Sequence, residues 1–118
     1  MRKFKELEIW KLGKSIAIET YRVSKSMPPE EVYGLTSQMR RAAISVPSNI
    51  AEGCSRSSNK EFVRFLEIAI GSSFELETQL IICLELGFLN EDALDEMLAT
   101  LETVQQKINA FIKSVKKF

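Results

Sequence analysis

Apolar residues recur at steps of three and four along almost the whole chain, which is the spacing of one face of an α-helix. The pattern is clearest near the C-terminus, where one stripe runs through Leu94, Leu98, Leu101, Val104, Ile108, Phe111, Ile112 and Val115. Asn90 is placed to cap the start of this segment, because its side-chain oxygen can accept from a free backbone N–H of the first turn. The pattern therefore predicts a long amphipathic helix after Asn90.

A second long helix is predicted between Ser58 and Gly87. Ser58 and Glu61 form a capping-box pattern, and glycine commonly follows the last turn of a helix. A 4-3 apolar repeat, which is typical of the seam inside a helix bundle, runs along it through Phe62, Leu66, Ala69, Ser73, Leu76, Leu80 and Cys83.

Two segments carry a second apolar stripe beside the first. In the helix after Ser58 this extra stripe contains Val63, Ile70, Phe74, Ile81 and Phe88. The first predicted helix, roughly residues 5–26, has one stripe of Leu7, Trp10, Ala17 and Tyr21 and another of Ile9, Leu12, Ile16 and Val23. A monomeric bundle has little room to bury both sets. We therefore expect self-association through Val63, Ile70, Phe74 and Ile81; the alternative is that both helices lie deep in an irregular core.

The remaining segment, about residues 35–54, reads as a helix with Pro47 at its centre. A proline there removes one backbone hydrogen bond and collides with the carbonyl of Ala43, at a cost of about 3 kcal/mol in an ordinary helix. Short connections that contain Met27-Pro28-Pro29, residues 55–58 and residues 87–90 join the helices, which favours antiparallel neighbours. The sequence predicts an all-α protein: a single up-down-up-down antiparallel four-helix bundle over residues 1–118.

A polar face accompanies the helix with Pro47. Its members recur at three- and four-residue steps, and they are Gln38, Arg41, Ser45, Asn49, Glu52 and Arg56. Glu75 and Gln79 on the next helix form a candidate facing pair. We interpret the set first as a hydrogen-bonded layer that fixes how the helices pack. The alternative is a groove for a protein partner, opened by Pro47.

Catalytic chemistry finds little support. The chain contains no histidine, and its five glycines do not form a phosphate-binding loop, so the common triads and nucleotide motifs are excluded. Cys54 and Cys83 stand apart and are expected to be buried and reduced. We expect no enzymatic activity, cofactor or metal. No apolar run approaches the length of a membrane span, and we expect a cytoplasmic protein without a membrane partner.

Net charge is zero, from 16 basic and 16 acidic residues, but the charge is uneven along the chain. Residues 1–28 hold seven basic and three acidic residues, whereas residues 57–89 hold two basic and five acidic residues. A basic face can therefore exist on a neutral molecule. The candidate nucleic-acid-binding residues are Lys11, Lys14, Arg22, Lys25, Arg40, Arg41 and Arg56.

Several short motifs resemble one known family. They are Trp10, then Glu31-Val32-Tyr33-Gly34-Leu35 with Gln38, Arg40-Arg41-Ala42-Ala43, Ser45-Val46, Asn49-Ile50-Ala51-Glu52-Gly53, and Phe65-Leu66-Glu67-Ile68-Ala69 with Gly71-Ser72 and Glu75. Over nearly its whole length the chain resembles the four-helix-bundle proteins encoded by intervening sequences within bacterial 23S rRNA genes. That family is related to the accessory variability protein of diversity-generating retroelements.

The resemblance implies a bundle that assembles as a ring, a homopentamer, with no enzymatic activity. Members of the retroelement branch are strongly basic and bind RNA and a reverse transcriptase, whereas this chain is neutral. We therefore expect a non-catalytic, self-assembling helical scaffold with a weak RNA-binding surface. A protein-binding adaptor that uses the polar face around Pro47 is the alternative.

Overall fold

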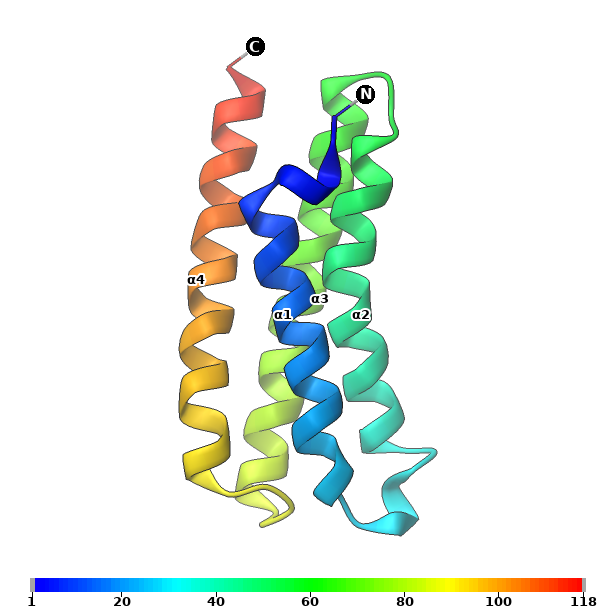
Figure 1. Ribbon diagram of the computed structural model, residues 1–118, viewed down its shortest axis with the longest axis vertical. Helices are drawn as coiled ribbons and strands as arrows, with labels where there is room; N and C mark the ends of the chain where they lie inside the picture. The colour runs from blue at the N-terminus through cyan, green and yellow to red at the C-terminus, as the bar shows by residue number, and fades with distance from the viewer. Residues whose placement is uncertain (1, 118) are drawn as a thin grey trace.

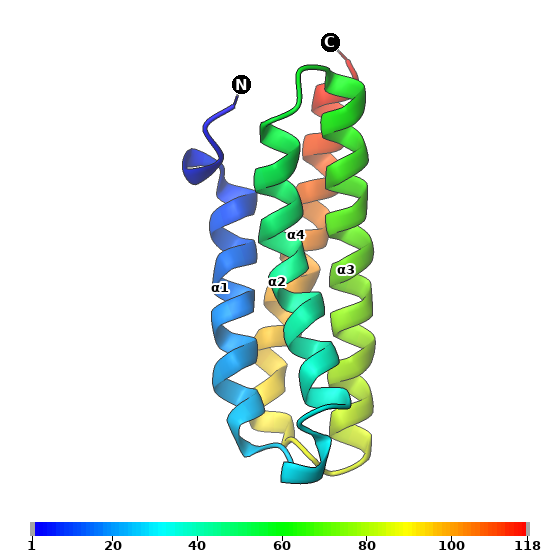
Figure 2. The ribbon, with the colours of Figure 1, turned by 90° about the vertical axis from the view of Figure 1, so that its right-hand side faces the viewer.

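Four long helices lie side by side along the molecule, which measures 46 × 24 × 20 Å (Figure 1). The computed structural model describes residues 2–117. The helices are α1 (Glu8–Val23), α2 (Leu35–Cys54), α3 (Asn59–Glu85) and α4 (Glu91–Lys116). Each helix packs against the next, and α1 also packs against α4, so the bundle is closed (Figures 1 and 2). The predicted all-α, antiparallel four-helix bundle is confirmed.

The predicted capping residues begin the last two helices. Ser58 Oγ accepts a hydrogen bond from the Glu61 backbone N–H at 3.2 Å, and Asn90 Oδ1 accepts one from the Ala93 backbone N–H at 2.8 Å. Gly87 follows α3 with a φ of +76°, a conformation that glycine adopts without strain. These local signals were sufficient to place the turns at both ends of α3.

The first helix is shorter than the sequence predicted. Leu7 has an extended backbone, so α1 begins only at Glu8, after a separate 3₁₀ turn (η1, Phe4–Glu6). At its other end two further 3₁₀ turns (η2, Ser24–Ser26 and η3, Pro29–Glu31) carry the chain toward α2. Prolines that lack an N–H and fix φ explain why a regular helix cannot continue through this connection.

The bundle core follows the predicted seam of α3. Phe62, Leu66, Ala69, Leu76 and Leu80 all have 0% exposure. On α4 the predicted stripe is buried except for two positions that are only half-buried, Leu98 and Phe111, while Met97 is buried instead of Leu98. Such a one-residue drift is expected when 3.6 residues per turn are approximated by whole-number steps.

The two stripes of α1 are accommodated within the chain's own core. Ile9, Ile16 and Ala17 are buried, and the other members pack against the core except Tyr21, which is 42% exposed. The stripe of Ile9, Leu12, Ile16 and Val23 therefore lies within the chain's own core, whereas the stripe of Trp10, Ala17 and Tyr21 reaches the surface at Tyr21. In α3 the outcome is mixed, because Val63 is buried whereas Phe74 and Ile81 are exposed.

Both cysteines are buried and carry free thiols. Burial raises the pKa of the Cys83 thiol to about 11, with a smaller contribution from the charge of Glu31. Burial also raises the pKa of Cys54, opposed by the nearby positive charge of Arg2. Both thiols are therefore protonated at neutral pH and poorly reactive. No helix among the described residues has the length and apolarity to cross a membrane.

Candidate assembly surfaces

The outward side of α3 carries exposed apolar side chains between Ile68 and Leu86. Phe74 is 53% exposed, and Ile81, two helical turns further on, is 38% exposed. Residues 67–86 include four glutamates and neither lysine nor arginine. We call this surface the α3 outer face, and it comprises Ile68, Phe74, Ile81, Ile82, Leu86, Glu67, Glu75 and Glu85. In Figure 2, α3 runs along one edge of the bundle.

Of the residues predicted for the oligomer interface, only some lie on that surface. Phe74 and Ile81 are exposed there, and Ile70 is half-buried next to Phe74 in a hollow between α3 and α4. Val63 is only 7% exposed and packs within the core, so it is not available to a second copy. The sequence pattern separated the second stripe of α3 from the buried seam. It could not show that Val63, the first residue of that stripe, is buried by the packing of the bundle.

A second apolar surface lies between α1 and α2. It is an open groove of about 500 Å³ whose exposed apolar members include Ile18 and Ile44, at 45% and 44% exposure. Three basic residues and no acidic residue line it. We call it the α1/α2 groove, and its lining residues are Trp10, Lys14, Ala17, Ile18, Tyr21, Arg22, Lys25, Ile44, Pro47, Ser48 and Ala51.

The close approach of α1 to α2 explains why this groove contains Pro47. Gly13 is buried against α2, and a Cβ at that position would lie 3.2 Å from Val46 Cγ1 and 3.4 Å from the Pro47 nitrogen. Glycine thus lets the two backbones come together at the proline. Pro47 faces α1, whereas Ser45 faces α3, so the predicted single site of Pro47 and the polar face is two separate surfaces.

The predicted polar network forms only in its middle. Ser45 Oγ lies 2.8 Å from Ser72 Oγ on α3, and Asn49 Nδ2 donates to both Ser45 Oγ and the Ser45 carbonyl at 2.8 Å. The Ser45–Ser72 hydrogen bond ties α2 to α3, and the two hydrogen bonds of Asn49 lie within α2. The centre of the polar face therefore contains hydrogen bonds of the kind that the interpretation as a packing layer predicts.

The residues at the two ends of the polar face do not take part in the hydrogen bonds of Ser45. Glu52, near the end of α2, pairs at 3.4 Å with Arg56 in the connection that follows the helix. Gln38, Arg41, Ala42, Ser45 and Glu75 line an open hollow of about 430 Å³ between α2 and α3, so four residues of the predicted polar set do lie together. Gln79, the other half of the predicted facing pair, is buried, and among the described residues its Oε1 atom has no hydrogen-bond partner.

We expect Ser45→Ala to lower the free energy of unfolding by about 1 kcal/mol, because it leaves the half-buried Ser72 hydroxyl without its partner and removes one of the two hydrogen bonds of Asn49 Nδ2. Arg41→Ala, at an exposed position, is expected to change it by less than about 0.5 kcal/mol. Urea unfolding followed by circular dichroism measures both. A cost for Arg41→Ala equal to that for Ser45→Ala would contradict the structural interpretation of the Ser45 layer.

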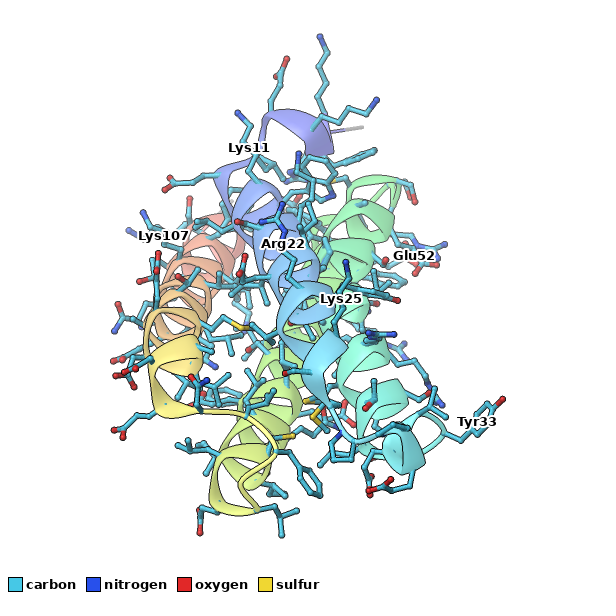
Figure 3. The ribbon with its side chains drawn as sticks, turned by 60° about the horizontal axis from the view of Figure 1, so that its bottom comes forward. Lys11, Arg22, Lys25, Tyr33, Glu52 and Lys107 are labelled. Atoms are coloured by element: carbon cyan, nitrogen blue, oxygen red, sulfur yellow. The ribbon has the colours of Figure 1, made fainter. Side chains whose placement is uncertain are left out.

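The seven candidate basic residues do not form one surface. Lys11, Lys14 and Arg22 extend from α1 and Lys25 from the turn η2 that follows it, as Figure 3 shows for Lys11, Arg22 and Lys25. Arg40 joins this side, because its guanidinium lies 4.7 Å from the Tyr21 ring and its Nε donates to Ser24 Oγ at 2.8 Å.

The last two basic residues lie elsewhere. Arg41 lines the hollow with Glu75, and Arg56 lies over the Phe65 ring at 4.8 Å near the far end of α2. The structure therefore brings together five of the seven predicted residues, and two of those five, Arg22 and Arg40, already have polar partners.

Sequence reasoning missed the exposed apolar residues that do not belong to a stripe. Ile18 and Ile44 line the groove, and Tyr33, in the connection before α2, is 95% exposed and points away from the bundle (Figure 3). A signal was present: each is a large apolar residue off the core-facing side of its segment. Among residues 2–117 no three His, Cys, Asp or Glu side chains gather as a metal-binding group.

Comparison with known proteins gives a family. A crystal structure of a protein of unknown function from the S23 ribosomal protein family of Bacteroides thetaiotaomicron has a similar fold, with a TM-score of 0.82 at 17% identity, over 89% of this chain and 98% of that one. No curated protein matches the sequence significantly. Residues 5–110 match the family profile described as 23S rRNA-intervening sequence protein. This chain therefore belongs to the 23S rRNA-intervening sequence protein family.

Proposed function

We propose that this protein is a non-catalytic helical scaffold that assembles with copies of itself. The observation that supports the proposal is the α3 outer face, where Phe74 is 53% exposed and Leu86 is 59% exposed on a helix already supplied with a complete buried seam. Exposed apolar side chains gathered on one surface of a folded chain mark an interaction site. Burying these side chains between copies removes them from water.

A closed ring of five copies, as the family resemblance implies, is the assembly that we propose. Most homo-oligomers are closed and symmetric, which limits the number of copies and leaves no interaction surface unpaired. The absence of histidine from the sequence and the raised thiol pKa values argue against imidazole-based and thiolate-based catalysis at neutral pH.

A weak RNA-binding surface on α1 is the second candidate function. It is favoured by the exposed side chains of Lys11 and Lys14 on α1 and of Lys25 in the turn that follows, although Lys14 Nζ also lies 5.0 Å from the centroid of the Trp10 ring. Such binding would weaken steeply with added salt, because each phosphate contact releases a counterion. Nucleic acid that copurifies with the protein at low salt and is removed at high salt would support it.

The assembly is tested by placing a charge at its proposed centre. Phe74→Glu is expected to raise the dissociation constant by about 30-fold or more, since loss of a central aromatic side chain commonly costs 2 kcal/mol or more of binding energy. Thr103→Glu introduces the same charge at an exposed position of α4 and is the matched control. Sedimentation equilibrium measures the dissociation constant of each variant.

The proposal is wrong if Phe74→Glu associates as tightly as the unmodified protein. At a concentration where all the proteins are monomeric, both variants should melt at the same temperature as the unmodified protein, because neither position is in the core. A loss of helix signal in Phe74→Glu would be checked with Phe74→Ser, which removes the apolar ring without a charge.

A further inference from the structure

We propose that the α3 outer face of one copy docks into the α1/α2 groove of a second copy. This inference rests on the proposed self-assembly and names the two surfaces that meet. The contact is then between two different surfaces, head to tail, and each copy uses both.

The charges of the two surfaces are complementary. Lys14, Arg22 and Lys25 border the apolar floor of the groove, and no acidic residue lines it. The α3 outer face presents Glu67, Glu75 and Glu85 among its apolar side chains, and residues 67–86 contain no basic residue. Basic residues lie at its borders, where Arg41 lines a hollow with Glu75, and Lys60, Arg64 and Lys116 line one with Glu67. A contact between two α3 outer faces would place glutamates against glutamates. Complementary potentials select the correct partner and penalise the like-charged one.

The shapes and lengths also agree. The groove lining on α1 extends from Trp10 to Arg22, which corresponds to roughly 18 Å of helix, and Lys25 follows in η2. The exposed apolar positions of the α3 outer face extend from Ile68 to Leu86, or roughly 27 Å. A groove between two helices that lie side by side can accept the side-chain ridge of a third helix, as in ordinary helix packing.

One copy can make both contacts at the same time. α1 and α3 each pack against α2 and α4, so they occupy opposite corners of the bundle. Figure 1 shows α1 in front and α3 behind it. The groove beside α1 and the outward face of α3 therefore do not overlap. Contacts of this kind repeat from copy to copy and close into a ring when the rotation between neighbours allows.

The test uses two variants that each damage one surface. Ile44→Glu places an acid in the groove, and Phe74→Glu places one on the α3 outer face. Each variant alone is expected to remain a monomer, because every head-to-tail contact needs both surfaces. An equal mixture of the two is expected to form a complex of twice the monomer mass and nothing larger, because each variant still has one intact surface.

Light scattering behind size-exclusion chromatography reads these masses, with Thr103→Glu as the charge control and Ile44→Ser as the replacement if Ile44→Glu loses its helix signal. The inference is overturned if Ile44→Glu and Ile44→Ser assemble like the unmodified protein, or if the mixture stays monomeric. It is also overturned if the groove instead binds nucleic acid, seen as absorbance at 260 nm that copurifies with the unmodified chain and is lost in Ile44→Glu. If the unmodified chain is itself a monomer, the proposed function fails, whatever the variants do.

Discussion

Phe62→Ala is expected to lower the free energy of unfolding by about 3–5 kcal/mol, which is a large share of the roughly 5–15 kcal/mol that keeps an ordinary domain folded. The Phe62 side chain has 0% exposure, and its ring packs edge-on against the Phe111 ring at 5.8 Å. The Arg2 guanidinium lies over the same ring, 4.1 Å from its centroid. Removal of the ring therefore leaves a cavity and also takes away an aromatic and a cationic contact. Denaturation by urea measures the change.

Phe74→Ala is the matched control for this core substitution. It removes the same side chain from the same helix, but at a position that is 53% exposed. At a concentration where the protein is monomeric, we expect its cost to be less than about 1 kcal/mol. Similar costs for the two substitutions would mean that the α3 seam does not form the core.

Gly53→Ala is expected to lower the free energy of unfolding by about 1–2 kcal/mol, although alanine is the better helix former. A Cβ at this position would lie 2.9 Å from Phe65 Cβ and 3.0 Å from Phe62 Cδ1. Phe65 Cβ is attached directly to its backbone and cannot move away alone, so α2 and α3 would have to separate near their connection. Thermal and urea unfolding both report the loss.

Gly71→Ala is expected to have the opposite sign. Gly71 lies inside α3 with nothing within 4 Å of the position of a Cβ, so alanine gains about 0.5–1 kcal/mol of helix propensity without a clash. Both glycine variants are best compared in the Phe74→Glu background, because Gly71 lies close to the proposed interface. A loss of stability for Gly71→Ala in that background would contradict the open surroundings of this residue.

Much of the fold could be predicted because its signals are local. Ser58 and Asn90 cap helices as their neighbours in sequence suggest, and Gly87 ends α3 with a positive φ. The 4-3 repeat of α3 identified the buried seam, since residues at those steps must share one face of any helix. Both kinds of signal depend on the helix itself and not on what packs against it.

The depth of each helix in the bundle could not be predicted in the same way. Two apolar stripes on α1 and two on α3 look alike in sequence, yet the structure packs all of the α1 pair except Tyr21 against the core and leaves Phe74 and Ile81 of α3 exposed. The difference comes from tertiary contacts. Gly13 lets α1 approach α2 at Pro47, which brings α1 deep into the bundle. Periodicity gives the direction of a face but not the distance to the next helix.

The candidate site was predicted only in part for the same reason. Ser45, Asn49 and Ser72 do form a polar layer, but the sequence placed Pro47 with them because it considered one helix alone. In the bundle α2 has neighbours on two sides, so Pro47 belongs to the α1/α2 groove and Ser45 to the contact with α3. Net charge likewise hid the contrast between the basic groove and the acidic α3 outer face.

Self-assembly is the central claim, and the mass of the unmodified protein in solution tests it most directly. Light scattering behind size-exclusion chromatography, at several concentrations up to tens of micromolar, gives that mass against the 13.4 kDa of one chain. We predict a single species of several times this mass, with no excess absorbance at 260 nm at high salt. A mass of 13.4 kDa at every concentration would contradict the claim.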